Sequence, residues 1–149
     1  MDSTALSLFS RVGGMPFFER LVDTFYRGVA SDEVLLPLYP EAPDLTGARH
    51  RLTLFLAQFW GGPHTYDDER GQPMLRMRHM PFRIGPLERD HWLANMATAV
   101  AEVCADLPDS ADLSDRTVAD ELMTYFVRTA EHMRNDTGLP ITSASFGER

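Results

Sequence analysis

Hydrophobic positions recur at helical spacing through most of the chain. From Pro16 to Val29, apolar residues fall every three or four positions, as they do on the buried face of a helix. The same pattern returns over residues 45–60, 86–106 and 115–134, and no stretch shows strand alternation or an internal repeat. The pattern therefore predicts an all-α protein with four substantial helices.

Breaks between these stretches predict the connections. Gly13-Gly14 ends whatever short amphipathic helix residues 1–12 form. Ser31 is suited to cap a single turn over residues 32–36, and the three prolines of residues 37–43 then predict an extended connection. Residues 63–73 hold two prolines, a glycine and a polar run, so we expect an ordered loop there.

A rigid corner is predicted over residues 75–92. Pro81 disfavours helical geometry in the residue before it, so a short helix must end near His79. Pro86 suits the first position of the next helix, whose first turn is acidic and complements the helix dipole. This arrangement lets His79 and Trp92 face one cavity.

Composition narrows the class of protein. A chain of 149 residues with 44% hydrophobic residues fits one domain, here residues 1–135, followed by a small, polar tail over residues 136–149. No apolar run approaches the ~18 residues of a transmembrane helix, and no signal-peptide pattern opens the chain. The single Cys104 excludes an internal disulfide and favours a cytoplasmic location. The net charge of −8 argues against nucleic acid or an anionic membrane as the main partner.

The five histidines differ in what their positions predict. We expect four of them at the surface: His50, His64, His91 and His132. His79 is different, because a helix end and a proline fix its direction. A histidine at a helix end also suits the dipole as a cation, so a role as a metal ligand does not follow from its position alone.

Three aromatic donors are predicted on inner surfaces, namely Tyr26, Tyr39 and Trp92. A buried hydroxyl or indole N–H needs a partner. Each partner is either a nearby backbone carbonyl or one acceptor that all three share in a pocket. Basic residues gather around the predicted corner, which indicates either a small anion or ordinary salt bridges: Arg70, Arg76, Arg78, Arg83 and Arg89.

The sequence resembles the group II truncated haemoglobins over residues 5–134. The motifs that carry the resemblance are Phe25-Tyr26, Leu38-Tyr39-Pro40, Phe59-Trp60-Gly61-Gly62-Pro63, Tyr66, Leu75-Arg76-Met77-Arg78-His79 and Pro81-Phe82-Arg83-Ile84, followed by Trp92. The resemblance implies a truncated globin, a two-over-two helical sandwich around haem b.

The resemblance also implies site residues. His79 matches the proximal histidine that coordinates the iron. The distal, ligand-binding positions match Tyr26, Trp92, Tyr39, Ala48 and Leu52. The positions around the cofactor match Phe55, Tyr66, Met77, Arg78, Phe82, Ile84 and Met96, with Tyr66 and Arg78 at the propionates. No catalytic residue is assigned.

The function that the resemblance implies is tight binding of dioxygen and other diatomic gases such as CO and NO. Oxygen scavenging, NO dioxygenation and a peroxidase-type reaction are all open, and the two reactions need an external reductase. A haem-based sensor and a haem-free helical interaction module are the alternatives. The habits of the family indicate a homodimer.

Overall fold

The structure, a computed structural model, describes residues 7–71, 84–107 and 115–134, and these contain helices and no strands. In chain order the elements are α1 (Leu8–Arg11), α2 (Met15–Ala30), the 3-10 helix η1 (Leu36–Leu38), α3 (Thr46–Phe59), α4 (Thr65–Arg70), α6 (Pro86–Cys104) and α7 (Asp115–Met133). The predicted all-α class and the four main helices are confirmed.

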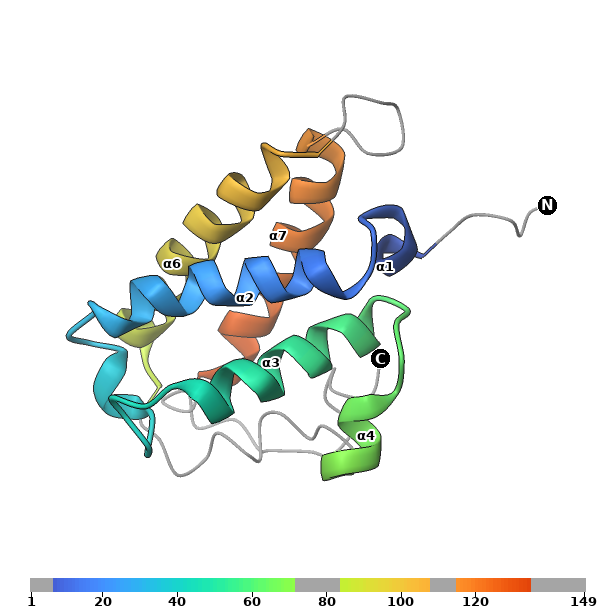
Figure 1. The fold of residues 1–149 in the computed structure, drawn as a ribbon. Helices are drawn as coiled ribbons and strands as arrows, with labels where there is room; N and C mark the ends of the chain where they lie inside the picture. The colour runs from blue at the N-terminus through green and yellow to red at the C-terminus, as the bar shows by residue number, and fades with distance from the viewer. Residues whose placement is uncertain (1–6, 72–83, 108–114, 135–149) are drawn as a thin grey trace.

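The four long helices form two layers. Figure 1 shows α2 and α3 side by side in one layer, with α6 and α7 behind them and steeply inclined to them. Contacts join α2 to α3, α6 to α7, and α2 to α6. This is a two-over-two sandwich, as expected.

The core lies where these layers meet. Every inner position predicted for α2 is buried, and Phe18 and Phe25 are fully enclosed. Met96 of α6 and Phe126 of α7 complete the centre. Each such side chain contributes about 1.5–3 kcal/mol when it leaves water, so the helical periodicity of the sequence reflects the main stabilising term.

The prediction of a loop over residues 63–73 is wrong at α4. Gln58 near the end of α3 is a buried polar side chain, 4% exposed. Its Oε1 accepts a hydrogen bond from the Asp67 backbone N–H at 3.0 Å, and its Nε2 donates to Asp67 Oδ1 at 2.9 Å. Because the first N–H groups of a helix lack internal partners, this amide caps α4 from the preceding helix. Local composition gives no sign of such a cap.

The connection after α2 also differs from the prediction. Asp32, rather than Ser31, organises the turn, because its Oδ1 accepts the backbone N–H groups of Val34 and Leu35 at 2.9 and 3.0 Å. The chain then continues into η1 instead of an extended segment. Pro37 lies in the first turn of η1, where a missing N–H costs nothing.

Some expectations fall outside the described residues. They are the short helix ending at His79, the cofactor positions Met77, Arg78 and Phe82, and the tail over residues 136–149. Among the helices that the structure does describe, none is long and apolar enough to cross a membrane.

Candidate functional site

A cavity of about 430 Å³ lies between the helical layers. It takes residues from α2, α3, α4, α6 and α7 and from the segment around η1. Most of the described site residues expected from the sequence line it: Tyr26, Tyr39, Ala48, Leu52, Phe55, Tyr66, Ile84 and Trp92. Met96 is not among the lining residues, since its side chain is fully buried in the core.

Two phenols meet at one end of the cavity. The rings of Tyr26 and Tyr39 lie 5.6 Å apart at 78°, edge to face. Burial raises the pKa of Tyr39 to about 12 despite a hydrogen bond from Tyr26 that lowers it. Burial, followed by the charge and hydrogen bond of Tyr39, raises the pKa of Tyr26 well above its ordinary value. Both hydroxyls therefore keep their protons at neutral pH, and within the pair Tyr26 donates to Tyr39.

Trp92 joins them from α6. The first turn of α6 is set by Glu88, whose Oε1 accepts a hydrogen bond from the Gly85 N–H at 2.8 Å. One turn later the indole packs against Phe25 of α2 at 5.2 Å and Phe126 of α7 at 5.6 Å between ring centroids. An indole N–H can only donate. Three donors from three parts of the chain thus line one cavity.

The α7 wall of the cavity was not assigned from the sequence. It consists of Tyr125, Phe126, Thr129, Ala130 and Met133. Most of these fall on the predicted inner face of the last helix, but periodicity cannot separate a residue that fills the core from one that lines a cavity. The Thr129 hydroxyl is buried and has no hydrogen-bond partner in the described part of the chain.

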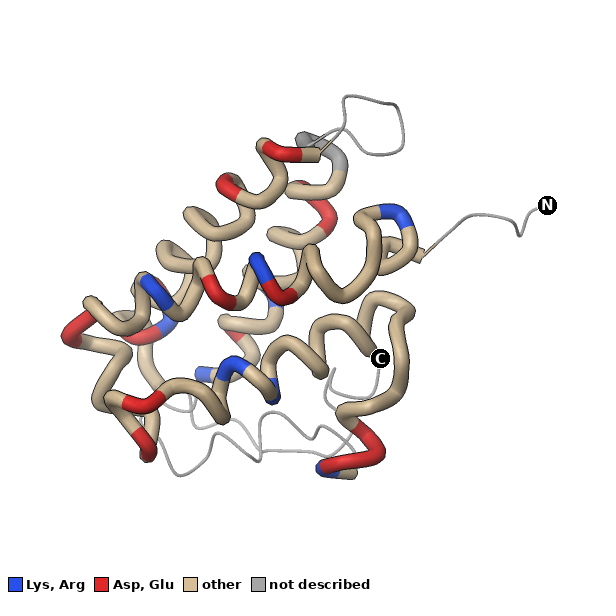
Figure 2. The backbone as a smooth tube through the Cα atoms, in the orientation of Figure 1, with Lys and Arg blue, Asp and Glu red and all other residues tan. Residues whose placement is uncertain are grey.

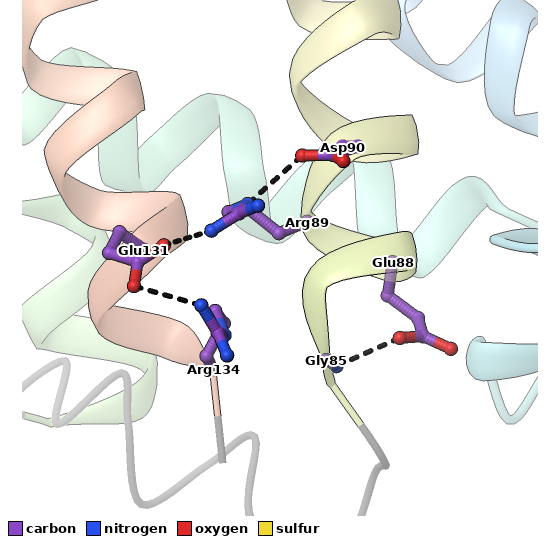
Figure 3. A network of polar contacts seen from close by, with 6 residues as sticks. All are labelled: Gly85, Glu88, Arg89, Asp90, Glu131 and Arg134. Atoms are coloured by element: carbon purple, nitrogen blue, oxygen red, sulfur yellow. Dashed lines mark hydrogen bonds and ion pairs between the residues drawn. The ribbon is translucent and has the colours of Figure 1, made fainter. Parts of the chain in front are cut away.

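Charged residues stand at the rim. Arg51, Arg70, Glu88 and Arg89 line the cavity among otherwise mostly apolar side chains. Figure 3 shows Arg89 bound to Asp90 and to Glu131, which also holds Arg134 at 3.1 Å and so ties the start of α6 to the end of α7. Figure 2 shows basic residues along α3 and acidic residues along α4. The local ion pairs account for part of the predicted basic cluster.

The described histidines mostly lie at the surface. His50 and His64 have side chains 57% and 73% exposed, as expected, and His132 is also exposed. His91 is more constrained, because its Nδ1 lies 3.0 Å from both carboxylate oxygens of Asp32.

Comparison with known proteins identifies the family. Residues 7–134 match the model of the bacterial-like globin family. The chain belongs to this family. Among its curated relatives, this globin is 39% identical to the group 2 truncated hemoglobin YjbI of Bacillus subtilis over 83% of the chain and 86% of the relative.

Solved structures agree. A thermostable hemoglobin from the actinobacterium Thermobifida fusca is 46% identical, with a TM-score of 0.79 over 89% of this globin and 99% of the other chain. A truncated oxygen-avid haemoglobin from Bacillus subtilis is 35% identical, with a TM-score of 0.74 over 87% of this globin and all of the other chain. The resemblance to group II truncated haemoglobins is therefore confirmed.

Membership of the globin family implies a haem cofactor and ligands of the oxygen type. The cavity suits a haem, because most of its lining is apolar and the polar residues of the lining fall into two sets, the aromatic donors and the charged residues. Donors that keep their protons stand at one end, and arginines suited to carboxylates stand at the rim. Thr129, whose buried hydroxyl has no hydrogen-bond partner among the described residues, is also one of the lining residues.

Proposed function

We propose that this globin holds haem b with His79 as the proximal iron ligand, binds dioxygen, CO and NO at the opposite side, and releases dioxygen slowly. The observation that carries the proposal is the convergence of Tyr26, Tyr39 and Trp92 on one cavity. Hydroxyl and indole N–H donors that line a mostly apolar cavity favour an acceptor within it, and a small ligand held between them supplies one.

Haem, when bound, supplies a ferrous iron that takes up diatomic ligands and transfers part of its electron density to them. The two phenol hydroxyls and the indole N–H then hold the ligand by donating hydrogen bonds. Each such bond contributes about 0.5–1.5 kcal/mol. Because ~1.4 kcal/mol is a factor of ten, two or three donors slow release on the order of a hundredfold.

Other lining residues suit the cofactor itself. Leu52, Phe55 and Ile84 offer an apolar surface and exclude water. Arg51 on α3 offers a cation to a haem carboxylate, and the Tyr66 hydroxyl offers a hydrogen bond to the same kind of group. Ala48 is small, so it leaves room for a gas to enter beside α3.

Slow release favours scavenging or chemical conversion of oxygen over its delivery. NO dioxygenation and a peroxidase-type reaction are the conversions we propose, and each draws electrons from an external reductase. A homodimer remains a prediction.

The first test is the absorption spectrum of the purified, reconstituted protein, before and after reduction and after addition of CO and dioxygen. We expect a histidine-ligated globin spectrum and a stable oxygen complex. His79→Ala should lose haem, whereas His50→Ala, which changes an exposed histidine, should keep it. Protein that takes up no haem, or a His79→Ala spectrum equal to that of the wild type, would favour the haem-free helical module.

A second measurement addresses the donors. Tyr26→Phe and Trp92→Phe should each raise the dioxygen dissociation rate by roughly threefold to tenfold, since each removes one hydrogen bond. Stopped-flow displacement of dioxygen by CO gives these rates. Unchanged rates in both variants would contradict the role of the cavity donors.

A further inference from the structure

Asp32 gathers an unusual number of hydrogen bonds just after α2. Its carboxylate accepts the backbone N–H groups of Val34 and Leu35, the Asn95 Nδ2 at 3.0 Å, and the His91 Nδ1 at 3.0 Å. Its side chain is only 12% exposed. Burial raises the pKa of Asp32, but the hydrogen bonds, that from His91 foremost, outweigh burial and leave the pKa below its ordinary value. The carboxylate is therefore an anchor shared by two segments far apart in the sequence.

Both segments lead directly to cavity donors. His91 is the residue before Trp92 on α6. On the other side, the turn that Asp32 organises continues through η1 to Tyr39. The lining of the cavity includes Tyr39 and Trp92 but neither Asp32 nor His91, so the anchor stands behind the donors.

The helices α2 and α6 are in close contact at this point. A Cβ built on Gly28 of α2 would lie 2.0 Å from Asn95 Oδ1, so the amide of α6 lies directly against the α2 backbone. The Asn95 Nδ2 also donates to the His91 carbonyl at 2.9 Å, which keeps the amide in register with its own helix. Any slip of α6 along α2 would break the contact to Asp32.

We infer that Asp32, His91 and Asn95 are positioning residues that set the separation of the distal donors. They hold Trp92 on α6 and the segment before Tyr39 at a fixed place relative to Tyr26 on α2. This inference rests on the proposed function, because the donors are taken to contact a bound diatomic ligand.

The chain contains a matched control. His50 and Glu69 form another histidine–carboxylate contact at 3.0 Å. Their side chains are 57% and 47% exposed, and neither lines the cavity. Exposed pairs of this kind contribute little, whereas the Asp32 carboxylate is largely buried and held by four donor groups.

The test compares His91→Ala, His91→Gln and His50→Ala in the haem-loaded, full-length protein. The readouts are the C–O stretching frequency of the CO complex, which responds to the donors around the ligand, and the dioxygen dissociation rate. We expect His91→Ala to shift and broaden the C–O band and to raise the dissociation rate about threefold to tenfold. His91→Gln keeps an N–H donor and should recover most of both values, and His50→Ala should change neither.

Asn95→Ser provides a second variant in case His91→Ala does not fold. It removes the amide contact to Asp32 and leaves His91 in place, so we expect a smaller change in the same direction. If both variants keep the wild-type band and rate while their melting temperatures fall, the network is purely structural and the inference is overturned. Wild-type protein without a stable oxygen complex would instead overturn the proposed function, and this inference with it.

Discussion

Two polar side chains outside the cavity lining cap turns that lead to cavity residues: Asp32 after α2 and Gln58 before α4. Each satisfies backbone N–H groups where the chain reverses direction. The Gln58 amide joins neighbours in sequence, since Asp67 lies nine residues away. Asp32 joins segments 59 and 63 residues apart and does so as a largely buried carboxylate.

The two contacts support different walls of the cavity. Gln58 supports α4, which carries Tyr66 against Phe55 with ring centroids 5.5 Å apart. Asp32 stands behind Tyr39 and Trp92. Under the proposed function, one kind of contact, a polar side chain that caps a turn, supports the cofactor wall at Gln58 and the donors at Asp32. Retention of haem and release of ligand should therefore respond to different substitutions.

The largest effect is expected from Gln58→Leu. This change leaves the partly buried Asp67 N–H without its partner and costs about 1–3 kcal/mol in the free energy of unfolding. Haem should also transfer faster to an external scavenger, because α4 and Tyr66 lose their support. Urea unfolding and the rate of haem transfer measure the two effects.

Asp68→Asn is the control for this change, because Asp68 is an exposed carboxylate of the same helix. It should leave stability and haem transfer close to the wild type. The C–O stretch should stay unchanged in both variants. If the C–O band of Gln58→Leu shifted as much as that of His91→Ala, the Gln58 and Asp32 contacts would not have separate roles.

Sequence patterns predict most of the fold because burial dominates it. The inner faces of α2, α6 and α7 follow from periodicity alone, and their boundaries agree within one or two residues. The elements that sequence reasoning missed, α4 and η1, are short, and each begins beside a side chain that accepts backbone N–H groups: Gln58 for α4 and Asp32 for the turn before η1. Local composition does not show which polar side chain takes this role.

The site divides in the same way. Tyr26, Tyr39 and Trp92 line the cavity, as predicted. The prediction was possible because these residues lie in specific motifs and carry donors that need partners. The α7 wall was missed, since an apolar stripe looks alike whether it fills a core or faces a ligand. The Asp32–His91 contact was missed because His91 lies on a helix face that reads as outward.

Substitutions at two helical glycines, Gly28 and Gly47, test the contact between Asn95 and Asp32. Alanine is favoured over glycine inside a helix by roughly 1 kcal/mol. In Gly28→Ala the new Cβ would meet Asn95 Oδ1 at 2.0 Å, so the amide must leave Asp32 and the gain turns into a loss of about 1 kcal/mol or more. Gly28→Ala should also raise the dioxygen dissociation rate.

Gly47→Ala in α3 is the matched control. Its nearest atoms, Glu41 Oε1 at 3.0 Å and Arg51 Nη1 at 3.1 Å, are the ends of flexible side chains that can move. We expect unchanged or slightly higher stability and an unchanged dissociation rate. If Gly28→Ala and Gly47→Ala had the same melting temperature, Asn95 would be able to move away from Gly28 without loss of stability, contrary to our expectation.

The last effect is confined to alkaline pH and concerns the ionisation of Tyr39. A tyrosine ionises near pH 10 in the unfolded chain, whereas the pKa of Tyr39 in the folded protein is about 12. Between these values the unfolded state binds fewer protons, so the free energy of unfolding falls as pH rises, and the contribution is fully present only below about pH 10. Tyr39→Phe should therefore make stability less dependent on pH in this window. The difference between wild-type and Tyr39→Phe absorbance at the tyrosinate band measures the same ionisation directly. A Tyr39 transition at the ordinary pKa would mean that its hydroxyl is in contact with water and is not buried beside Tyr26.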